Sequence, residues 1–481
     1  MKFRSYLAIF GISMLGFVAV SQAEEVEKQV SSDKTTNMNI SIYNNDVAFV
    51  RDRRNVDLQH GLNKIAYVGV SSQIRPETAM LYGKAIEVIE QNYNYNMLNQ
   101  SNLLEAYIGK KVKTALYNEQ TGKTIYDSAE VLDGGKGNPV LKFSYGIETD
   151  YPGRIIFDNI PTELRREPTL VIDLNNKAVS GQQEIELAYL TGGVSWKADY
   201  VAEIQEDDKL KLNGWISLSN NSGVDYDKAS VQLIAGSVNK VNEVIAPMMV
   251  MRSAKTAGAF MGNGVADSAM MPTSESFADY YLYQLPIKTD IKDKQTKQVN
   301  LMTKDKVDYN KEYKLNSPLY LSYKSNETEF TKANPEVIYK LNNVKEEGLG
   351  VAIPSGTIRF FESDKNKNLQ FIGEAKLPQL TVGETAELDL GQAFDIYAKG
   401  KVVSVQKISD KTSEVEVEIT LQNSKADSVT VSFIQNYNGH WKIIEESEKS
   451  QKRNAYSSEW KINLPANEKQ ILTYKVQLSQ K

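Results

Sequence analysis

Apolar and polar residues alternate along most of the chain, and the stretch from Ile185 to Gly236 shows the pattern most clearly. Two alternating runs flank a glycine turn at Gly192-Gly193: Ile185, Leu187 and Tyr189, then Trp196, Ala198, Tyr200, Ala202 and Ile204. A period of two is typical of half-buried strands. Further strands are predicted around Trp215 and Val231. We therefore expect the centre of an antiparallel sheet here, with Trp196 and Tyr200 in its core.

The same alternation recurs in short runs elsewhere, so the sequence predicts an all-β fold of several antiparallel sheets and sandwiches. The predicted parts are a signal peptide (1–23), a flexible lead-in (24–36), an N-terminal β segment (37–97), a small β-barrel insertion (98–148), a central β domain (149–245), a Met/Ala/Gly-rich flexible loop (246–276), the continued central domain (277–398) and an immunoglobulin-like sandwich (399–481). A length of 481 residues suits about three domains.

The barrel insertion is predicted from one helical turn followed by short strands. Ser101 is a suitable cap for the turn, and glycines then break the chain at Gly122, Gly134-Gly135 and Gly146. This pattern resembles a small SH3- or Sm-like barrel, which by itself implies no ligand. The glycine-rich run around Gly134 lacks the spacing of a phosphate-binding loop and predicts a hairpin turn.

The last segment shows the clearest sandwich pattern. Apolar residues alternate with Glu and Thr from Val415 to Leu421, and about seven short strands follow one another. This spacing is typical of an immunoglobulin-like sandwich, here without its disulfide because the chain has no cysteine.

The first residues predict export. Lys2 and Arg4 precede the apolar run Leu7 to Val20, and Ser21-Gln22-Ala23 fits a cleavage site. The alternative, a membrane anchor, would need a run of about 20 apolar residues. No later segment is apolar enough to span a membrane after removal of the leader. We expect a periplasmic protein, with an extracellular location as the alternative.

The amino-acid composition excludes or disfavours several classes of catalytic site, metal site and partner. The absence of cysteine excludes thiolate nucleophiles, zinc–sulfur sites and iron–sulfur clusters. The formal net charge of −5 disfavours nucleic acid as a partner. The two histidines, His60 and His440, lie at expected hairpin tips. No catalytic motif is present, so we expect no cofactor, no metal site and no assigned catalytic residue.

The 246–276 segment holds half of the twelve methionines. They are Met248, Met249, Met251, Met261, Met270 and Met271. A flexible loop is the first interpretation. Methionine side chains also make adaptable protein-contact surfaces, so these six are the candidate partner contacts. Copper(I) binding is the third interpretation, although no histidine lies near.

Other candidate groups carry less weight. Asp225 and Asp227 could form a glycosidase pair on one strand face, but 61 acidic residues make such a pair expected by chance. Asp364, Asn366 and Asn368 have calcium-loop spacing without its glycine, so a hairpin tip is predicted. The arginines near Arg51 could bind an anion or form salt bridges. The 26 tyrosines could bind sugars or fill sandwich cores.

Several ordered motifs resemble a family of exported bacterial proteins. They are Tyr189 to Tyr200, Leu218 to Gly223, Leu233 to Gly236, Gly348 to Gly350, Ile353 to Arg359, Phe371 to Glu374 and Leu390 to Asp395. The family's C-terminal domain, of unknown function, also occurs in mucoidy inhibitor A-like proteins. The long helical hairpin of those proteins is missing here. The resemblance implies a β fold and an exported location, and it carries no catalytic residues.

The sequence therefore predicts an exported cell-envelope protein with a binding or structural role through protein–protein contacts. The alternative is a carbohydrate- or envelope-polymer-binding protein, which could also be a hydrolase. An exposed row of three aromatic side chains would favour sugar as the ligand.

Overall fold

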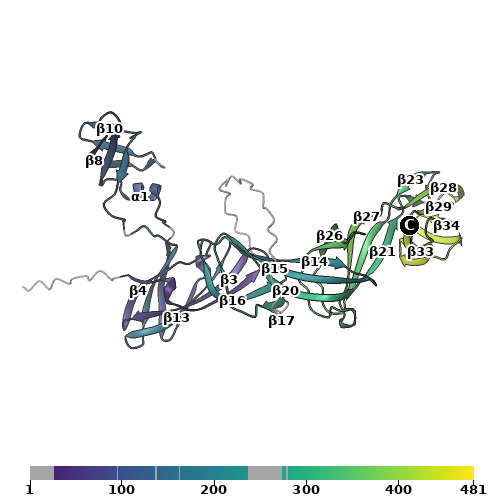
Figure 1. The fold of residues 1–481 in the computed structure, drawn as a ribbon, viewed down its shortest axis with the longest axis horizontal. Helices are drawn as coiled ribbons and strands as arrows, with labels where there is room; N and C mark the ends of the chain where they lie inside the picture. The colour runs from purple at the N-terminus through teal and green to yellow at the C-terminus, as the bar shows by residue number, and fades with distance from the viewer. Residues whose placement is uncertain are drawn as a thin grey trace, which may run out of the picture. The chain divides into compact units, whose positions relative to one another are not determined.

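The computed structural model describes residues 27–94, 96–135, 138–161, 163–236, 273–277 and 280–480, with the backbone only for 273–277 (Figure 1). Strands dominate these residues, which confirms the all-β prediction. The chain divides into two compact units, one formed by Met1–Asn37 and Asp52–Tyr189 and the other by Met38–Arg51 and Leu190–Lys481. Three strands run from one unit into the other: β2 (Thr35–Tyr43), β3 (Val47–Leu58) and β13 (Gly181–Thr191).

The first unit contains a four-stranded sheet in the order β1-β4-β12-β6. Its strands are β1 (Lys28–Val30), β4 (Gly61–Val68), β12 (Thr169–Asn176) and β6 (Ile86–Asn94), with β5 (Met80–Gly83) paired to β13 and 3-10 turns η1 (Ser32–Lys34) and η2 (Pro76–Thr78). Arg54 of β3 is only 1% exposed. It forms an ion pair with Asp52, so one of the three neighbouring arginines belongs to the core.

The same unit contains a five-stranded sheet preceded by the helix α1 (Gln100–Ala106). The strands lie in the order β10-β9-β8-β7-β11, with bounds β7 (Lys111–Asn118), β8 (Lys123–Asp133), β9 (Val140–Phe143), β10 (Gly146–Glu148) and β11 (Arg154–Ile156). We call residues 98–158 the five-stranded domain. Because β11 pairs with β7, the domain extends beyond the predicted range of 98–148. Its core includes Tyr107, Val131, Leu141 and Phe143.

The second unit begins with the predicted central strands. They are β14 (Val194–Ile204), β15 (Lys209–Asn220), β16 (Tyr226–Ala235), β17 (Thr273–Phe277), β18 (Tyr280–Gln284), β19 (Thr289–Ile291), β20 (Gln295–Asp308), β25 (Gly356–Ser363) and β26 (Leu369–Leu377). One sheet has the order β20-β15-β14-β25-β26, whereas β13 and β16 belong to another sheet, with the order β17-β18-β16-β2-β3-β13-β5. The prediction of a single antiparallel sheet from Ile185 to Gly236 is therefore wrong, because β13 and β14 do not pair and β14 runs parallel to β25. Trp196 and Tyr200 are buried, which confirms their predicted place in the core.

A close contact between β14 and β25 explains one glycine of this unit. The two strands run parallel and pair Ala198 with Gly356. A Cβ atom at Gly356 would lie 2.3 Å from the Ala198 carbonyl oxygen, so a side chain cannot fit without moving the backbone. Nearby, the Tyr200 hydroxyl donates a 2.7 Å hydrogen bond to the Pro354 carbonyl. Stretches far apart in the sequence therefore meet at this point.

The rest of the second unit packs two sheets around one core. The elements are β21 (Asn310–Asn316), β22 (Leu321–Ser322), β23 (Glu329–Ala333), β24 (Glu336–Asn342), η4 (Lys345–Glu347), β27 (Thr385–Gln392), β28 (Ile396–Ser409), β29 (Thr412–Asn423), β30 (Val429–Asn438), β31 (His440–Glu446), β32 (Gln451–Asn454), β33 (Ser457–Leu464) and β34 (Lys469–Ser479). Their orders are β27-β24-β21-β30-β33-β32 and β23-β28-β29-β34-β31. Both sheets contribute to a core around Trp460, as expected for a sandwich.

Two buried asparagines form hydrogen bonds with main-chain groups at the ends of strands. Asn220, at the end of β15, donates to the carbonyls of Val224 and Ile291 and accepts from the amide of Ser222. Asn423 does the same at the end of β29, where its oxygen accepts from the amide of Lys425. Both side chains are fully buried. A single amide thus satisfies main-chain groups that the end of a strand leaves unpaired.

Candidate binding pocket beside helix α1

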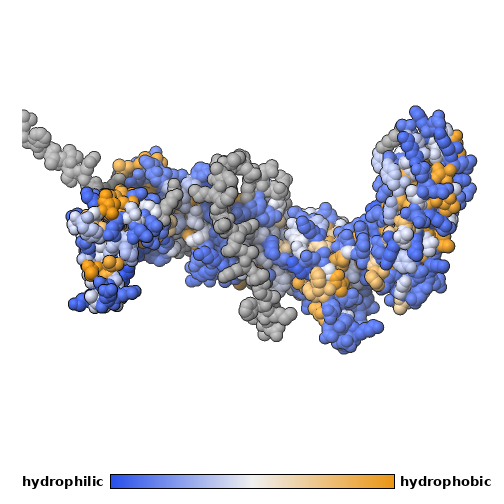
Figure 2. All heavy atoms as spheres, turned by 90° about the horizontal axis from the view of Figure 1, so that it is seen from above, coloured by the Kyte–Doolittle hydropathy of each residue, from blue (hydrophilic) through white to orange (hydrophobic). Residues whose placement is uncertain are grey.

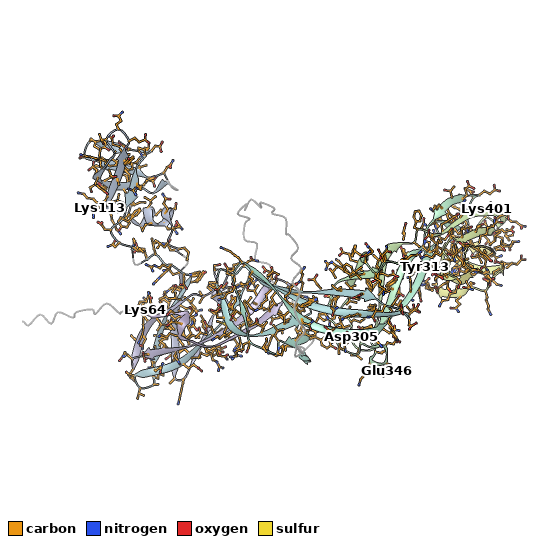
Figure 3. All side chains as sticks on the ribbon, viewed as in Figure 1. Lys64, Lys113, Asp305, Tyr313, Glu346 and Lys401 are labelled. Atoms are coloured by element: carbon orange, nitrogen blue, oxygen red, sulfur yellow. The ribbon has the colours of Figure 1, made fainter. Side chains whose placement is uncertain are left out.

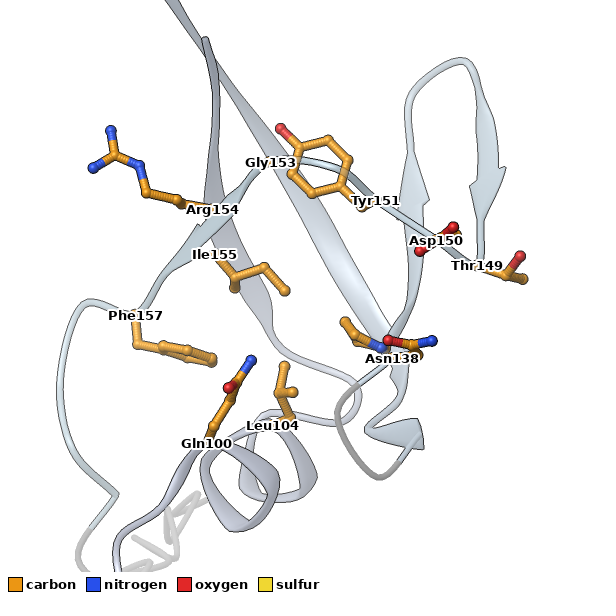
Figure 4. Close-up of a pocket in the computed structure, with 11 residues that line it drawn as sticks. Gln100, Leu104, Asn138, Thr149, Asp150, Tyr151, Gly153, Arg154, Ile155 and Phe157 are labelled. Atoms are coloured by element: carbon orange, nitrogen blue, oxygen red, sulfur yellow. The ribbon is translucent and has the colours of Figure 1, made fainter.

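A cavity of about 430 Å³ lies between α1, the start of β9 and β11 in the five-stranded domain. Figure 4 shows its lining, formed by Gln100, Leu104, Asn138, Pro139, Thr149, Asp150, Tyr151, Gly153, Arg154, Ile155 and Phe157. This volume lies within the range of small-ligand and side-chain pockets. The cavity is our candidate functional site.

Local capping and aromatic packing fix the walls of the pocket. Asn99 caps α1 by accepting a 2.9 Å hydrogen bond from the amide of Asn102, so the prediction of Ser101 as the cap is wrong, since Ser101 lies inside the helix. The helix is held on the sheet by Leu104, which is fully buried, and by Tyr107, whose hydroxyl donates to the Asn159 side chain at 2.7 Å. The ring of Phe157 meets that of Tyr107 edge to face at 4.9 Å. The pocket is therefore built on packed groups.

The pocket has an apolar floor. The side chains of Leu104, Ile155 and Phe157 point toward one another in Figure 4, and the side chain of Gln100 points into the same space. Arg154 lines the pocket close to the main chain, but its guanidinium points away. An apolar group that enters this space would be removed from water, at roughly 25 cal/mol per Å² of buried apolar surface.

The rim adds polar groups that no protein atom uses. The side chains of Gln100, Asn138 and Asp150 have no hydrogen-bond or ion-pair partner among the described residues. Each amide can both donate and accept, as a peptide main chain also does. The Asp150 carboxylate favours a cation. The lining contains a single carboxylate and no histidine, so its groups suit binding better than paired acid–base chemistry.

A second cavity, of about 570 Å³, lies in the other unit near the start of β21. Its lining is mostly polar or charged, and two of the charged side chains already have partners. Lys311 lies 5.4 Å from the centre of the Tyr339 ring, and Glu312 pairs with Lys340 at 2.7 Å. This cavity lacks an apolar floor comparable to that beside α1.

The six methionines predicted as partner contacts, Met248, Met249, Met251, Met261, Met270 and Met271, lie outside the described residues. Their interpretation as a contact loop stays a prediction.

The acidic pair Asp225 and Asp227 is bridged by a lysine. The Lys292 ammonium lies 3.1 Å from Asp225 and 2.5 Å from Asp227. The pKa of Asp225 is lowered, chiefly by the hydrogen bond from the amide of Asp293; burial opposes this shift, and the nearby Lys292 adds to it. A proton donor needs a raised pKa, so this carboxyl is a poor general acid.

Other sequence candidates have structural roles. The Asp364 carboxylate accepts hydrogen bonds from the amides of Asn366 and Asn368, as expected for a hairpin tip. Arg53 pairs with Glu186, and Arg54 pairs with Asp52, as in the salt-bridge interpretation. Within the described part of the chain, no group of three or more His, Asp or Glu side chains could hold a metal ion.

The polar residues of the pocket were not predictable from the sequence. Gln100, Asn138 and Asp150 belong to no motif, and more than ten residues separate each from the next. The usable signal was indirect: a capped helical turn followed by glycine-broken strands indicates a small domain with a helix over one end. Which polar residues gather at that end depends on the fold.

Comparison with known proteins adds no assignment: no protein-family model and no curated protein matches the chain. Among the described residues, no helix is both long enough and apolar enough to cross a membrane. The function has to be argued from the pocket and the surfaces of the chain itself.

Proposed function

We propose that this chain is an exported cell-envelope protein that binds a protein partner, and that the pocket beside α1 receives an extended segment of that partner. One observation carries the proposal: Gln100, Asn138 and Asp150, all without protein partners, surround an apolar floor. All three side chains are exposed at the mouth of the cavity, so they are open to a ligand that places an apolar group on the floor beneath them.

The chemistry of the pocket favours a polypeptide. An apolar side chain of the partner packs against Leu104, Ile155 and Phe157. The amides of Gln100 and Asn138 hydrogen-bond its main chain, which offers donors and acceptors in alternation. Asp150 pairs with a lysine or arginine next to the inserted side chain. Extended segments are commonly recognised in this way, by main-chain bonds and side-chain pockets together.

The strand order also supports an SH3- or Sm-like barrel for the five-stranded domain. Across the sheet, the strands lie in the order β10-β9-β8-β7-β11, so the first four in sequence are consecutive neighbours and the fifth pairs with the first. The helix α1 precedes them in the chain. Such small barrels serve many functions, so the likeness supports the fold and leaves the ligand to the pocket.

The expected location rests on the leader pattern and on the resemblance to an exported family. A basic start, an apolar run and a small-residue cleavage site at Ser21-Gln22-Ala23 support export. The periplasm is the proposed compartment, with the extracellular space as the alternative.

The test is site-specific photo-crosslinking in envelope preparations. A photoreactive amino acid replaces Gln100 in the pocket, and in a control protein it replaces Glu119, an exposed residue outside the pocket lining. We expect one protein to be captured from position 100 and not from position 119. The same capture is repeated with Asp150→Lys and with Glu119→Lys, which introduce the same charge change.

Capture lost in Asp150→Lys and kept in Glu119→Lys supports the proposal. Capture of the same proteins from both positions, or capture insensitive to Asp150→Lys, would overturn it. Thermal unfolding of both variants checks that the domain remains folded. Asp150 is exposed and has no protein partner, so a change below about 0.5 kcal/mol is expected.

A further inference from the structure

The five-stranded domain has a second surface, the side of its sheet that faces away from its core. Paired residues of neighbouring strands lie on the same side of a sheet. The strand pairings place one set of residues on the side opposite the core residues Val112, Val131 and Leu141. We call this set the outer face: Lys111, Lys113, Ala115, Tyr117, Thr124, Tyr126, Ser128, Glu130, Lys142, Ile147, Arg154 and Ile156.

Two tyrosines on this face are unusually open for strand residues. Tyr126 is 68% exposed and Tyr117 is 59% exposed. They are diagonal neighbours, because Tyr117 pairs with Thr124 while Tyr126 pairs with Ala115. Neither hydroxyl has a hydrogen-bond partner among the described residues. Each tyrosine thus offers an open aromatic face and a hydroxyl without a partner among the described residues, and together they make a pair where the sequence criterion for sugar asked for a row of three.

Arg154 lies beside the tyrosines. Ala115 pairs with Tyr126 on one side and with Arg154 on the other, so a small residue separates the ring from the guanidinium. Ala115 is only 2% exposed. No ion pair to Arg154 is formed within the described residues. This arrangement presents an aromatic face and an uncommitted cation side by side.

The outer face is basic, although the chain as a whole is acidic, with a formal net charge of −5. The face has more positive than negative side chains. The four cations are Lys111, Lys113, Lys142 and Arg154, and the two carboxylates next to them are those of Glu130 and Asp158. Lys113 pairs with Asp158 at 2.7 Å, and Lys142 lies 3.8 Å from Glu130. Lys111 and Arg154 are left without partners in the described chain. Figure 3 marks Lys113 on this part of the protein.

We propose that the outer face binds an acidic polysaccharide, whose sugar rings stack on Tyr117 and Tyr126 and whose carboxylates pair with Arg154 and Lys111. Flat aromatic rings match the apolar faces of sugar rings, and tyrosine hydroxyls can bond sugar hydroxyls. From Lys111 to Tyr117 the strand spans about 20 Å, which exceeds a single sugar and suits a polymer. The unpaired cations select an acidic polymer over a neutral one.

Other features of the surface point away from competing ligands. Nucleic acid binding uses many phosphate contacts, whereas the outer face has four cations, of which Lys113 and Lys142 form ion pairs within the described residues. Figure 2 shows that hydrophobic residues on the visible side of the molecule form small groups among hydrophilic ones, without one broad apolar area. The two tyrosines with free hydroxyls favour a hydroxyl-rich ligand over an apolar protein surface.

This inference is independent of the proposed protein partner. The residues that act in the pocket are Gln100, Asn138 and Asp150, whereas those that act on the outer face are Tyr117, Tyr126, Arg154 and Lys111. The Arg154 guanidinium points away from the pocket, so its replacement separates the two sites (Figure 4). Loss of polysaccharide binding with normal crosslinking from position 100, or the reverse, distinguishes the two proposals.

The experiment measures binding of the full mature chain to polygalacturonate at low salt, by isothermal titration and by affinity gel electrophoresis. Dextran, polyglutamate and single-stranded DNA are the comparison polymers. The variants are Tyr117→Ala, Tyr126→Ala and Arg154→Gln. The matched controls are Tyr145→Ala and Lys123→Gln. Tyr145 is 65% exposed but stacks on Phe143 and donates to Glu148, and Lys123 lies at the end of β8 away from Arg154.

We expect polygalacturonate to bind and dextran not to bind. Each tyrosine variant should weaken binding by about tenfold, Arg154→Gln by a similar factor, and the controls by less than about twofold. Added salt should weaken the wild-type protein more than Arg154→Gln. All variants should unfold at nearly the wild-type temperature, since the replaced side chains are exposed.

Three results would overturn the proposal. The first is absence of polygalacturonate binding by the wild-type chain. The second is binding of polygalacturonate that neither tyrosine variant weakens, because the polymer would then be held by the cations alone, without stacking on the tyrosine rings. The third is binding of polyglutamate or single-stranded DNA as tight as that of polygalacturonate, because that would assign the face to another class of polymer.

Discussion

Replacement of Arg54 by methionine tests how the first unit is held together. Its guanidinium donates to Asp52 at 2.9 and 2.6 Å, and to the carbonyls of Val30 and Val68 at 2.7 and 2.6 Å. It also lies 4.1 Å from the centre of the Tyr67 ring. Arg54→Met keeps much of the apolar volume and removes every one of these donors.

The expected cost follows from what the change leaves behind. Asp52 is only 3% exposed. After the change its carboxylate would keep the hydrogen bond that the Thr35 hydroxyl donates at 3.1 Å. Breaking a buried pair by removing one partner typically costs about 3–5 kcal/mol. For a unit of about this size, 1 kcal/mol corresponds to roughly 2–4 °C, so Tm should fall by roughly 6–20 °C.

A double-mutant cycle with Asp52→Leu isolates the pair. The loss in free energy of unfolding of the double variant should be smaller, by at least about 2 kcal/mol, than the sum of the losses of the two single variants. The reason is that no unpaired charge remains buried. Arg53→Met is the control on the neighbouring residue, whose side chain is 40% exposed, and should cost about 1 kcal/mol. The assays are thermal unfolding and hydrogen exchange in β1, which Arg54 contacts through Val30. Additive single changes, or a cost of Arg54→Met below about 1 kcal/mol, would refute this reasoning.

Three further predictions concern the second unit and the buried tyrosines. Tyr200→Phe should destabilise by about 1–2 kcal/mol in thermal unfolding, because the buried Pro354 carbonyl loses its 2.7 Å donor; no measurable change would contradict this. Asn423→Ala should cost about 2–4 kcal/mol in urea unfolding, since several buried main-chain groups lose partners together, whereas exposed Asn366→Ala should cost clearly less. Burial raises the pKa of Tyr309 to about 12 and also raises the pKa of Tyr200. Their contribution to the stability of the fold is complete below pH about 10. It is lost as pH rises toward 12, because the tyrosines ionise more readily in the unfolded chain. Absorbance at 295 nm with circular dichroism should show part of the 26 tyrosines ionising only as the strands unfold; complete ionisation at pH 10 with intact strands would contradict this.

The candidate site shows where sequence patterns stop being informative. The short helix and the following strands were predictable because helix signals and glycine breaks act over a few residues, although the cap is Asn99 and not the predicted Ser101. The pocket was not, because Gln100, Asn138 and Asp150 become neighbours only when β9 and β11 are placed around α1. The exposed tyrosines illustrate the same limit. Tyr126 and Tyr200 both occupy strands, yet one is open and the other is buried.

The sequence by itself determined the all-β fold and the inward side of the strongest strands. Period-two alternation places Trp196, Ala198 and Tyr200 on one face whatever the partner strand is, and the structure buries all three. The tertiary structure alone decided which distant groups meet. Arg54 and Arg53 are neighbours in sequence, but adjacent strand residues point to opposite sides, so one enters the core and the other stays at the surface. Long-range pairing also placed Arg154 beside Tyr126, because β11 pairs with the distant β7, whereas the register between β7 and β8 is set locally by their hairpin turn.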